Sequence, residues 1–415
     1  MTPSMAELAR VFCRIGALSF GGPAAQIALM HRELVETRTW LSEDQFLRAL
    51  SLCMLLPGPE AMQLATYAGW RLRGTIGGLI AGVLFVLPGA LVIFALAFGY
   101  VYIVDVPLVQ AAFSGIKAAV LVIVLQALVN LSRKALHGRP AWTLAGLAFV
   151  AVFAAGLPFP AVIAAAALYG AWAIVDTEIE TVHHIQVNLR GTLRTTTVWA
   201  ALWFAPILLL WFAGASFLVD VALFFSKLAV VTFGGAYALL AYMTQTVVGD
   251  YGWITTVQMI DALGLAETTP GPLILVTQFV AVLAGVSESD LGLGLAAGLV
   301  TLWVTFVPCF LWIFLAGPYL EAITARPRIN AALKAITAAV VGVILNLAIW
   351  FGVHVLFGEV TSADWHAAPV PLLVSLDLRA LLLFALAGVL ILALHRSMLQ
   401  TLMIMAVAGA VAGSL

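Results

Sequence analysis

Residues 55–60 of the chain read LLPGPE, and residues 268–273 read TTPGPL. Upstream, residues 19–23 read SFGGP and residues 232–236 read TFGGA, so both motifs repeat at the same offset along the chain (270 − 57 = 232 − 19 = 213). A proline on each side of a glycine forbids a continuous helix, and paired glycines weaken one. The same helix interruptions therefore recur in two halves, which indicates a duplicated chain.

The composition places this chain in a membrane. Hydrophobic residues make up 63% of the 415 residues and charged residues 9%, with a mean hydropathy of +1.10. Uncharged stretches such as residues 75–103 exceed the roughly 20 residues that a spanning helix needs. The chain contains no basic tract of the kind that binds nucleic acid, and its three cysteines lie singly, without disulfide or metal-cluster spacing. We therefore expect lipid surroundings, no nucleic-acid partner, no metal and no cofactor.

Two kinds of apolar segment occur along the chain. The segments read as spans lie at about 76–103, 107–131, 141–157, 160–175, 196–216, 292–316, 335–356, 380–394 and 398–415. Four Gly/Pro-interrupted pairs are too short to cross, namely 5–20 with 23–35, 44–56 with 59–72, 221–233 with 236–248, and 257–269 with 272–284. We expect each pair to be a re-entrant or broken helix, because irregular backbone at membrane depth must be covered by protein or line a cavity.

Loop charge predicts that the two halves face opposite ways. First-half loops around Arg32, Arg71 and Arg133 are basic, whereas the corresponding second-half loops, at 244–252, 285–291 and 357–377, hold acidic residues and no Lys or Arg. By the positive-inside rule, the halves have inverted topologies. We predict an all-α polytopic membrane protein of two inverted homologous halves, with broken helices at the midplane, a layout used for alternating access.

The boundaries of these halves follow from the same pattern. The predicted domains are a first repeat at 1–176, a cytoplasmic linker at 177–195, an extra transmembrane helix at 196–216 that inverts the second half, and a second repeat at 217–415.

A helix break in a membrane is either a simple kink or a binding site. Recurrence at matched positions in two halves favours a site. Each break exposes amides at the start of the next helix, where the helix dipole favours an anion.

Two matched cations precede the breaks. Arg14 and Lys227 each lie five residues before a hydroxyl residue, Ser19 or Thr232, in an apolar segment. A cation inside a membrane indicates a functional site unless it reaches the interface by snorkelling. With the two hydroxyls, these cations suit a divalent tetrahedral oxyanion, and we expect Arg14 to contact it directly and Lys227 less directly.

The predicted site combines these groups from both halves. The substrate-binding residues are expected to be Arg14, Ser19, Gly21, Gly22, Pro57, Gly58, Pro59, Lys227, Thr232, Gly234, Gly235, Thr268, Thr269, Pro270, Gly271 and Pro272.

Two carboxylates beside the breaks, Glu60 and Glu267, are candidates for coupling transport to protons. Glu267 is the stronger candidate, because apolar surroundings favour the neutral form of a carboxyl group near physiological pH. Glu60 follows Pro59 in the first turn of a helix, where the dipole favours the ionised form. A helix-dipole or ion-pairing role remains the alternative for both.

Several long strings resemble the chromate transporter (CHR) family in its long, two-domain form. They are FGGP at 20–23, LLPGPE at 55–60, LPG at 87–89, GLAETTPGP at 264–272 and FVPCF at 306–310. The resemblance covers nearly the whole chain. The second half carries Ala236 where the first has Pro23, so the two breaks are chemically unequal.

The resemblance implies a function. It implies a multi-pass protein of the bacterial inner membrane that exports chromate and so gives chromate resistance, with the isosteric sulfate ion as competitor. Alternatives are a sulfate or other oxyanion importer, and an anion channel. An enzyme would need a nucleophile–base or metal constellation, and the sequence offers none. The coupling ion and oligomeric state stay open, with a homodimer as one outcome.

The inverted layout predicts which side of the membrane each loop faces. Arg71 and Arg133 should face the cytoplasm, and Glu288 and Asp364 the periplasm, because basic loops remain inside. Single cysteines at positions 73 and 286, treated with an impermeant thiol reagent in intact cells, should label only at 286. Labelling of both positions from one side would contradict the inverted arrangement.

Overall fold

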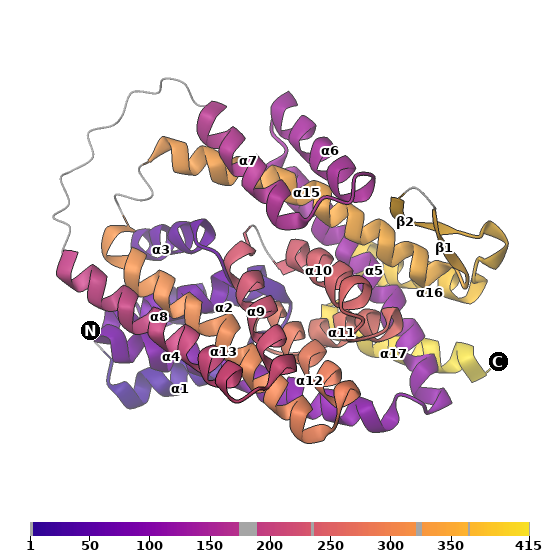
Figure 1. Ribbon diagram of the computed structural model, residues 1–415, viewed down its shortest axis with the longest axis horizontal. Helices are drawn as coiled ribbons and strands as arrows, with labels where there is room; N and C mark the ends of the chain where they lie inside the picture. The colour runs from indigo at the N-terminus through magenta and orange to yellow at the C-terminus, as the bar shows by residue number, and fades with distance from the viewer. Residues whose placement is uncertain (1–2, 174–188, 234–235, 321–325, 364–365, 415) are drawn as a thin grey trace. The chain divides into compact units, whose positions relative to one another are not determined.

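The computed structural model describes residues 3–173, 189–233, 236–320, 326–363 and 366–414, and helices make up most of them (Figure 1). The first half contains α1 (Met5–Leu18), α2 (Gly22–His31), η1 (Arg32–Thr37), α3 (Glu43–Leu55), α4 (Glu60–Ile103), α5 (Pro107–Ala135), α6 (Arg139–Phe153) and α7 (Phe159–Ala173).

The remaining elements begin after the linker. They are α8 (Leu189–Phe212), α9 (Ser216–Val231), α10 (Ala236–Thr244), η2 (Gln245–Asp250), α11 (Thr256–Thr268), η3 (Leu273–Leu275), α12 (Val276–Glu288), α13 (Leu291–Ala316), η4 (Gly317–Tyr319), α15 (Pro327–Leu356), β1 (Val360–Ala363), β2 (His366–Pro371), η5 (Leu373–Ser375), α16 (Leu378–Gly388), η6 (Val389–Ala393) and α17 (Met398–Ser414).

The predicted helix breaks are present, and the elements around them recur in register. α3 and α11 are both 13 residues long and start 213 positions apart (256 − 43 = 213). Each is preceded by a six-residue π-helix, η1 or η2, at the same offset (245 − 32 = 213). A π-helix is rare, so its recurrence at matched positions shows that the duplication preserves local backbone as well as sequence.

Five helices in the described residues are long and apolar enough to cross a membrane. They are Glu60–Ile103, Pro107–Ala135, Leu189–Phe212, Leu291–Tyr319 and Pro327–Leu356. Four other segments read as spans, at 141–157, 160–175, 380–394 and 398–415, form the shorter apolar helices α6, α7, α16 with η6, and α17. These features are those of a multi-pass membrane protein.

One detail confirms the sequence expectation and another differs from it. The segments 59–72 and 76–103 lie within α4 but are separate helices, because the backbone at Arg73 and Gly74 is non-helical and Gly74 adopts a φ of 65° that suits glycine. The chain folds back there, since a Cβ at Gly69 would lie 2.3 Å from the carbonyl oxygen of Gly77. The loop at 357–377 contains an antiparallel hairpin of β1 and β2, in which Val360 pairs with Pro371. The short strands lack the alternating hydrophobic pattern that would have predicted them.

The described chain divides into two compact units that do not follow the sequence halves. Unit 1 comprises residues 1–98, 174–236 and 269–330, and unit 2 comprises 99–173, 237–268 and 331–415. Each unit therefore takes segments from both repeats. The predicted domain boundaries at 176, 195 and 216 describe repeats along the chain and stay a prediction.

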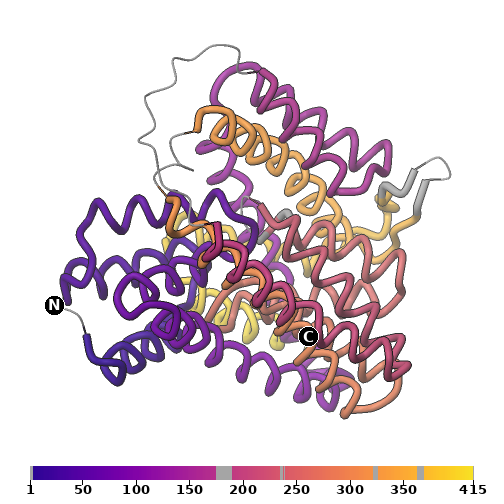
Figure 2. Tube along the Cα trace, turned by 60° about the vertical axis from the view of Figure 1, so that its left-hand side comes forward, coloured from indigo at the N-terminus to yellow at the C-terminus, as the bar shows by residue number. Residues whose placement is uncertain are grey.

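Within unit 1, long helices pack through matched glycine–phenylalanine contacts. α8 lies along α13, as Figure 2 shows. A Cβ at Gly78 would lie 2.9 Å from a ring carbon of Phe314, and a Cβ at Gly298 would lie 2.6 Å from a ring carbon of Phe94. The two contacts join equivalent positions of the repeats (298 − 78 = 314 − 94 = 220). Glycine is needed at both because the facing ring leaves no room for a side chain.

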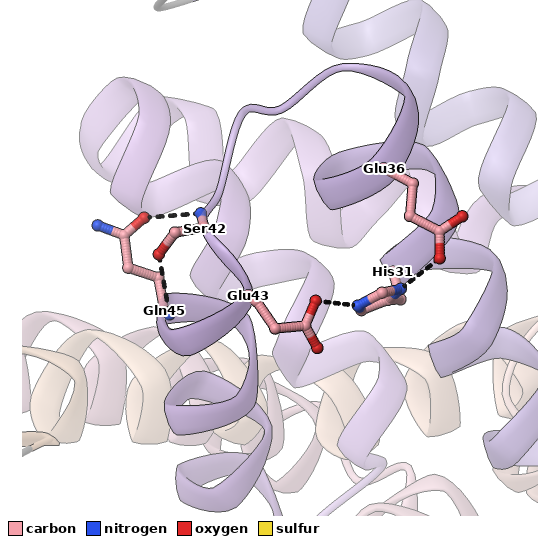
Figure 3. Close-up of polar contacts among 5 residues, drawn as sticks. All are labelled: His31, Glu36, Ser42, Glu43 and Gln45. Atoms are coloured by element: carbon pink, nitrogen blue, oxygen red, sulfur yellow. Dashed lines mark hydrogen bonds and ion pairs between the residues drawn. The ribbon is translucent and has the colours of Figure 1, made fainter.

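The turn between η1 and α3 is held by polar side chains (Figure 3). Ser42 and Gln45 form a capping box, in which each side chain accepts a hydrogen bond from the other residue's backbone N–H at 3.2 Å. His31, at the end of α2, contacts Glu43 at 2.6 Å and Glu36 at 3.1 Å. The hydrogen bond to Glu43 raises the pKa of His31, so the charged imidazole persists to higher pH.

Candidate functional site

The helix breaks of unit 1 surround a small cavity. Its volume is about 20 Å³, room for roughly one water molecule. The lining residues come from both repeats and all belong to unit 1; they are Pro23, Gln26, Gly58, Pro59, Glu60, Ala61, Thr232, Pro272, Leu273 and Ile274.

Two backbone hydrogen bonds join the breaks reciprocally. The N–H of Gly58 donates to the carbonyl oxygen of Thr232, and the N–H of Gly271 donates to that of Ser19, both at 2.9 Å. Gly58 corresponds to Gly271 and Thr232 to Ser19 in the repeat (271 − 58 = 232 − 19 = 213). Each half therefore satisfies a backbone group that the other half's break exposes.

Local sequence explains why these breaks take this form. Gly58 and Gly271 have φ values of 119° and 89°, in the region that favours glycine, and each lies between two prolines. The prolines lack N–H groups and disfavour helix in the residues that precede them. The glycine is therefore the one residue of each Pro-Gly-Pro motif whose N–H can cross to the other half.

The hydroxyl groups of Ser19 and Thr232 are used locally. The Ser19 hydroxyl donates to the carbonyl oxygen of Ile15, and the Thr232 hydroxyl donates to that of Leu228, both at 2.6 Å. In both cases the proton satisfies a carbonyl at the end of its own helix. This geometry leaves the two hydroxyl protons directed away from a ligand.

Two helix starts lie beside the cavity. Ala61 lies in the first turn of α4, whose first helical hydrogen bond runs from Gln63 N–H to Pro59 O at 3.0 Å. Leu273 opens η3, which leads into α12. First-turn N–H groups have no acceptor within their helix, and the dipole adds positive potential there. The cavity wall is therefore suited to an anion at these two points.

Two glutamines form a set that the sequence analysis missed. The Gln26 amide nitrogen donates to Gly271 O at 2.6 Å and to Ser19 O at 3.3 Å. The Gln63 amide nitrogen donates to Pro57 O at 2.7 Å. Both side chains satisfy carbonyls at the breaks. In the sequence, each glutamine is a polar residue in a short apolar segment just after one of the two first-half breaks.

The other residues predicted for the site differ in their positions. Gly21 and Gly22 form the bend before α2, with φ of 89° and 76°. The Thr268 hydroxyl donates to Leu265 O at 2.7 Å within its own helix. Pro57, Thr269 and Pro270 lie beside the lining without forming part of it, and Gly234 and Gly235 lie outside the described residues.

The two predicted cations do not line the cavity. Arg14 is exposed on α1, whose buried face carries Val11, Phe12 and Ile15. Lys227 is likewise exposed on α9. Helical spacing places both on the side of their helices opposite the buried residues. A role for them in substrate binding stays a prediction.

The two candidate carboxylates lie in different settings. Glu60 lines the cavity at the start of α4. Glu267 does not line it; it is 6% exposed in unit 2 and accepts a hydrogen bond from the Tyr237 hydroxyl at 2.9 Å. The coupling role predicted for Glu267 does not require it to contact the substrate, and it stays a prediction.

Unit 2 contains an ion pair between the buried Asp261 and the half-buried Lys117. The Lys117 ammonium lies 3.0 Å from the Asp261 carboxylate, whose other oxygen accepts a hydrogen bond from the Tyr100 hydroxyl at 2.8 Å. The sequence marks Lys117 as a charge in the middle of a span, but Asp261 is found as its partner only in the structure. No group of three or more His, Cys, Asp or Glu side chains with metal-site geometry occurs among the residues described.

Apolar spanning helices together with a cavity built at matched helix breaks define a multi-pass membrane transporter. The chain belongs to the chromate transporter family, which matches residues 6–171 and 219–414. Members of this family are membrane transporters rather than enzymes.

Relatives of similar length carry chromate transport in their names. The "Chromate transport protein" of Pseudomonas aeruginosa is 34% identical over 82% of this chain and 79% of its own length. The "Chromate transport protein" of Cupriavidus metallidurans is 30% identical over 84% of this chain and 82% of its own length. The "Probable chromate transport protein" of Synechococcus elongatus is 30% identical over 84% of this chain and 85% of its own length. No solved structure matches the chain.

The Lys117–Asp261 ion pair of unit 2 should behave as a stability element. Lys117→Met should lower the free energy of unfolding by about 3–5 kcal/mol, because it leaves the buried Asp261 carboxylate without its charge partner. Asp261→Asn should lower it by less, because the Lys117 side chain is 20% exposed. The double variant should lose much less than the sum. Denaturant unfolding in detergent micelles measures this, with the exposed Lys334→Met as control. Additive losses in the double variant would show that the two groups are not coupled.

Proposed function

We propose that this protein is a secondary transporter that exports chromate across the bacterial inner membrane by alternating access, with the cavity at the helix breaks as its substrate site. The observation that carries the proposal is the reciprocal pair of hydrogen bonds from Gly58 to Thr232 and from Gly271 to Ser19. Family membership and the relatives' names support chromate as the substrate.

Reciprocal contacts between equivalent residues are what a pseudo-two-fold axis produces. Gly78 with Phe314 and Gly298 with Phe94 follow the same rule within unit 1. Together with the opposite loop charges of the two halves, these contacts support an inverted repeat, whose axis lies in the membrane plane. In such a layout, exchanging the conformations of the two halves about the pseudo-two-fold axis opens the same site to the opposite side of the membrane.

The cavity itself supports a mechanism with a closed state. A volume of about 20 Å³ admits a water molecule and no tetrahedral oxyanion. Binding therefore requires the breaks to separate, and the first-turn amides near Ala61 and Leu273 then become available to the anion. A permanently open channel does not need such a closure.

Vesicle transport distinguishes the export proposal from its alternatives. Everted membrane vesicles carrying the full chain should accumulate labelled chromate saturably when a pH gradient or a membrane potential is imposed separately. Gly58→Ala and Gly271→Ala should each lower uptake by about tenfold, because an alanine at positive φ is strained. Gly99→Ala, where a Cβ meets no atom within 4 Å, is the matched control.

Three results would contradict the export proposal. Non-saturating flux independent of both gradients indicates a channel. Uptake confined to right-side-out vesicles indicates an importer. Sulfate flux without chromate flux indicates a different oxyanion as substrate.

Proton coupling through Glu267 is a further part of the proposal. Glu267→Gln should abolish the pH dependence of chromate flux while leaving chromate binding within about twofold of the parent, because the amide keeps the acceptor for Tyr237 but cannot titrate. Flux against pH in vesicles measures this, with the exposed Glu288→Gln as control. A pH profile unchanged from the parent would remove Glu267 from the coupling step.

A further inference from the structure

Unit 2 contains a pocket of its own. Its volume is about 390 Å³, and its lining comes from α5, α15, α16 and α17 and from the segment that follows α15. Small-molecule sites in proteins have volumes of roughly 300–1,000 Å³. The polar lining residues are Ser114, Lys117, His354, Asp377 and Arg379, and the remaining ones are apolar residues or glycines. The pocket is therefore large enough for a ligand and has charged groups to bind one.

Two of these charges have opposite signs and are not paired with each other. Asp377 is the N-cap of α16, and its Oδ1 accepts hydrogen bonds from the backbone N–H groups of Arg379 at 2.8 Å and Ala380 at 3.1 Å. The other carboxylate oxygen, Oδ2, takes no part in these bonds. Among the residues that the structure describes, the Arg379 guanidinium forms no ion pair with Asp377. The pocket thus offers a carboxylate oxygen and a guanidinium group to a ligand.

Lys117 adds a second cation. Its ammonium group lies 3.0 Å from Asp261, and its side chain is 20% exposed, so the ammonium protons that do not point at Asp261 can meet a ligand. Lys117 lies ten residues into α5 (117 − 107 = 10), about 15 Å along the helix axis. Its side chain leans toward the N-terminal end of the helix.

The length of α5 places this end of the pocket near the membrane surface. The helix has 29 residues and is about 44 Å long, whereas the hydrocarbon core of a bilayer is about 30 Å thick. The first turns of α5 therefore extend beyond the hydrocarbon core. Because the Lys117 side chain leans toward those turns, its ammonium group lies close to the level of the lipid headgroups.

Exposed aliphatic side chains accompany the charged residues along the chain. Leu373 and Val374 of η5 are 79% and 100% exposed, and Leu378 and Leu382 of α16 are 66% and 71% exposed. Leu378 lies between the two charged residues of α16 in the sequence. Apolar surface of this extent is typical of contact with lipid or another protein. In a multi-pass membrane protein, these surroundings favour a ligand that combines a polar headgroup with acyl chains over a free ion.

We propose that the unit 2 pocket binds the headgroup of a phospholipid that carries a primary ammonium group, phosphatidylethanolamine. The phosphodiester lies between Arg379 and Lys117, the ammonium group donates to Asp377 Oδ2, and the acyl chains follow the aliphatic face of α16. Charge complementarity carries the choice of headgroup. An anionic headgroup would place its charge beside the Asp377 carboxylate, and a trimethylated ammonium has no N–H group to donate. The site goes beyond the proposed transport function and does not depend on it.

The experiment measures the binding of three phospholipids with identical acyl chains to the purified full-length protein in detergent micelles, by native mass spectrometry. Phosphatidylethanolamine should bind about tenfold more tightly than phosphatidylglycerol, which lacks the ammonium group, and than phosphatidylcholine, whose ammonium has no proton. Equal binding of all three phospholipids would overturn the proposal.

Two ligands without acyl chains separate a lipid from a free ion. Glycerophosphoethanolamine has the same headgroup, and inorganic phosphate has the same tetrahedral oxyanion. Neither should displace phosphatidylethanolamine when it is present at the same concentration as the lipid. Displacement by either at that concentration would assign the pocket to a free ligand and overturn its assignment to a lipid.

Removal of the guanidinium group tests the phosphate contact. Arg379→Gln should weaken phosphatidylethanolamine binding by about tenfold, because a charge-assisted hydrogen bond to the phosphodiester is lost. Arg396→Gln changes another exposed arginine of unit 2 and should leave the affinity as in the parent. An Arg379→Gln protein that binds this lipid as tightly as the parent would overturn the site.

A gain of binding gives a test that misfolding cannot imitate. Asp377→Asn keeps a side-chain oxygen for the N-cap of α16 but removes the negative charge, so phosphatidylglycerol should bind about tenfold more tightly than it binds the parent. Asp290 caps α13 in the same way, accepting from the Leu293 N–H at 2.8 Å, so Asp290→Asn is the matched control and should keep the parent's preference. An Asp377→Asn protein that still discriminates against phosphatidylglycerol as the parent does would overturn the role of Asp377 and with it the proposed headgroup.

Discussion

The structure of unit 1 depends on one constraint, namely that backbone groups freed by a helix break must find partners in apolar surroundings. A buried N–H or carbonyl without a partner is costly, and lipid offers no water to replace it. The chain meets this constraint by exchange between its halves, from Gly58 to Thr232 and from Gly271 to Ser19. Neither half can bury its breaks alone, which explains why unit 1 takes segments from both repeats.

The side chains near the breaks serve the same constraint. Ser19 and Thr232 return their hydroxyl protons to the helices that end there, and Gln26 and Gln63 donate to the remaining carbonyls. Once these bonds are made, few donors and acceptors remain for a ligand. The cavity is also lined by the Glu60 carboxylate, and the Gln26 oxygen has no hydrogen-bond partner among the described residues.

The polar groups discussed above belong to different units. Unit 1 contains the cavity, whereas unit 2 contains the Lys117–Asp261 pair and the Glu267–Tyr237 hydrogen bond. Charges enclosed by apolar helices are retained at a cost, so each must stabilise the fold or take part in function. Chain connectivity links them: the helix α11 carries both Asp261 and Glu267 and leads directly into the second Pro-Gly-Pro break.

The sequence by itself determined the membrane class, the family and the positions of the helix breaks. These rest on local rules, because proline and glycine act on their own backbone and hydropathy acts over one span. The sequence did not determine which side chains meet at the breaks. It predicted a ligand role for Arg14 and for the Ser19 hydroxyl, and this role stays a prediction; in the structure Arg14 is exposed and the Ser19 hydroxyl donates to the carbonyl oxygen of Ile15. It also passed over Gln26. Only the tertiary structure shows the contacts that cross between the halves, because Gly58 and Gly271 donate to Thr232 and Ser19, which lie far away along the chain.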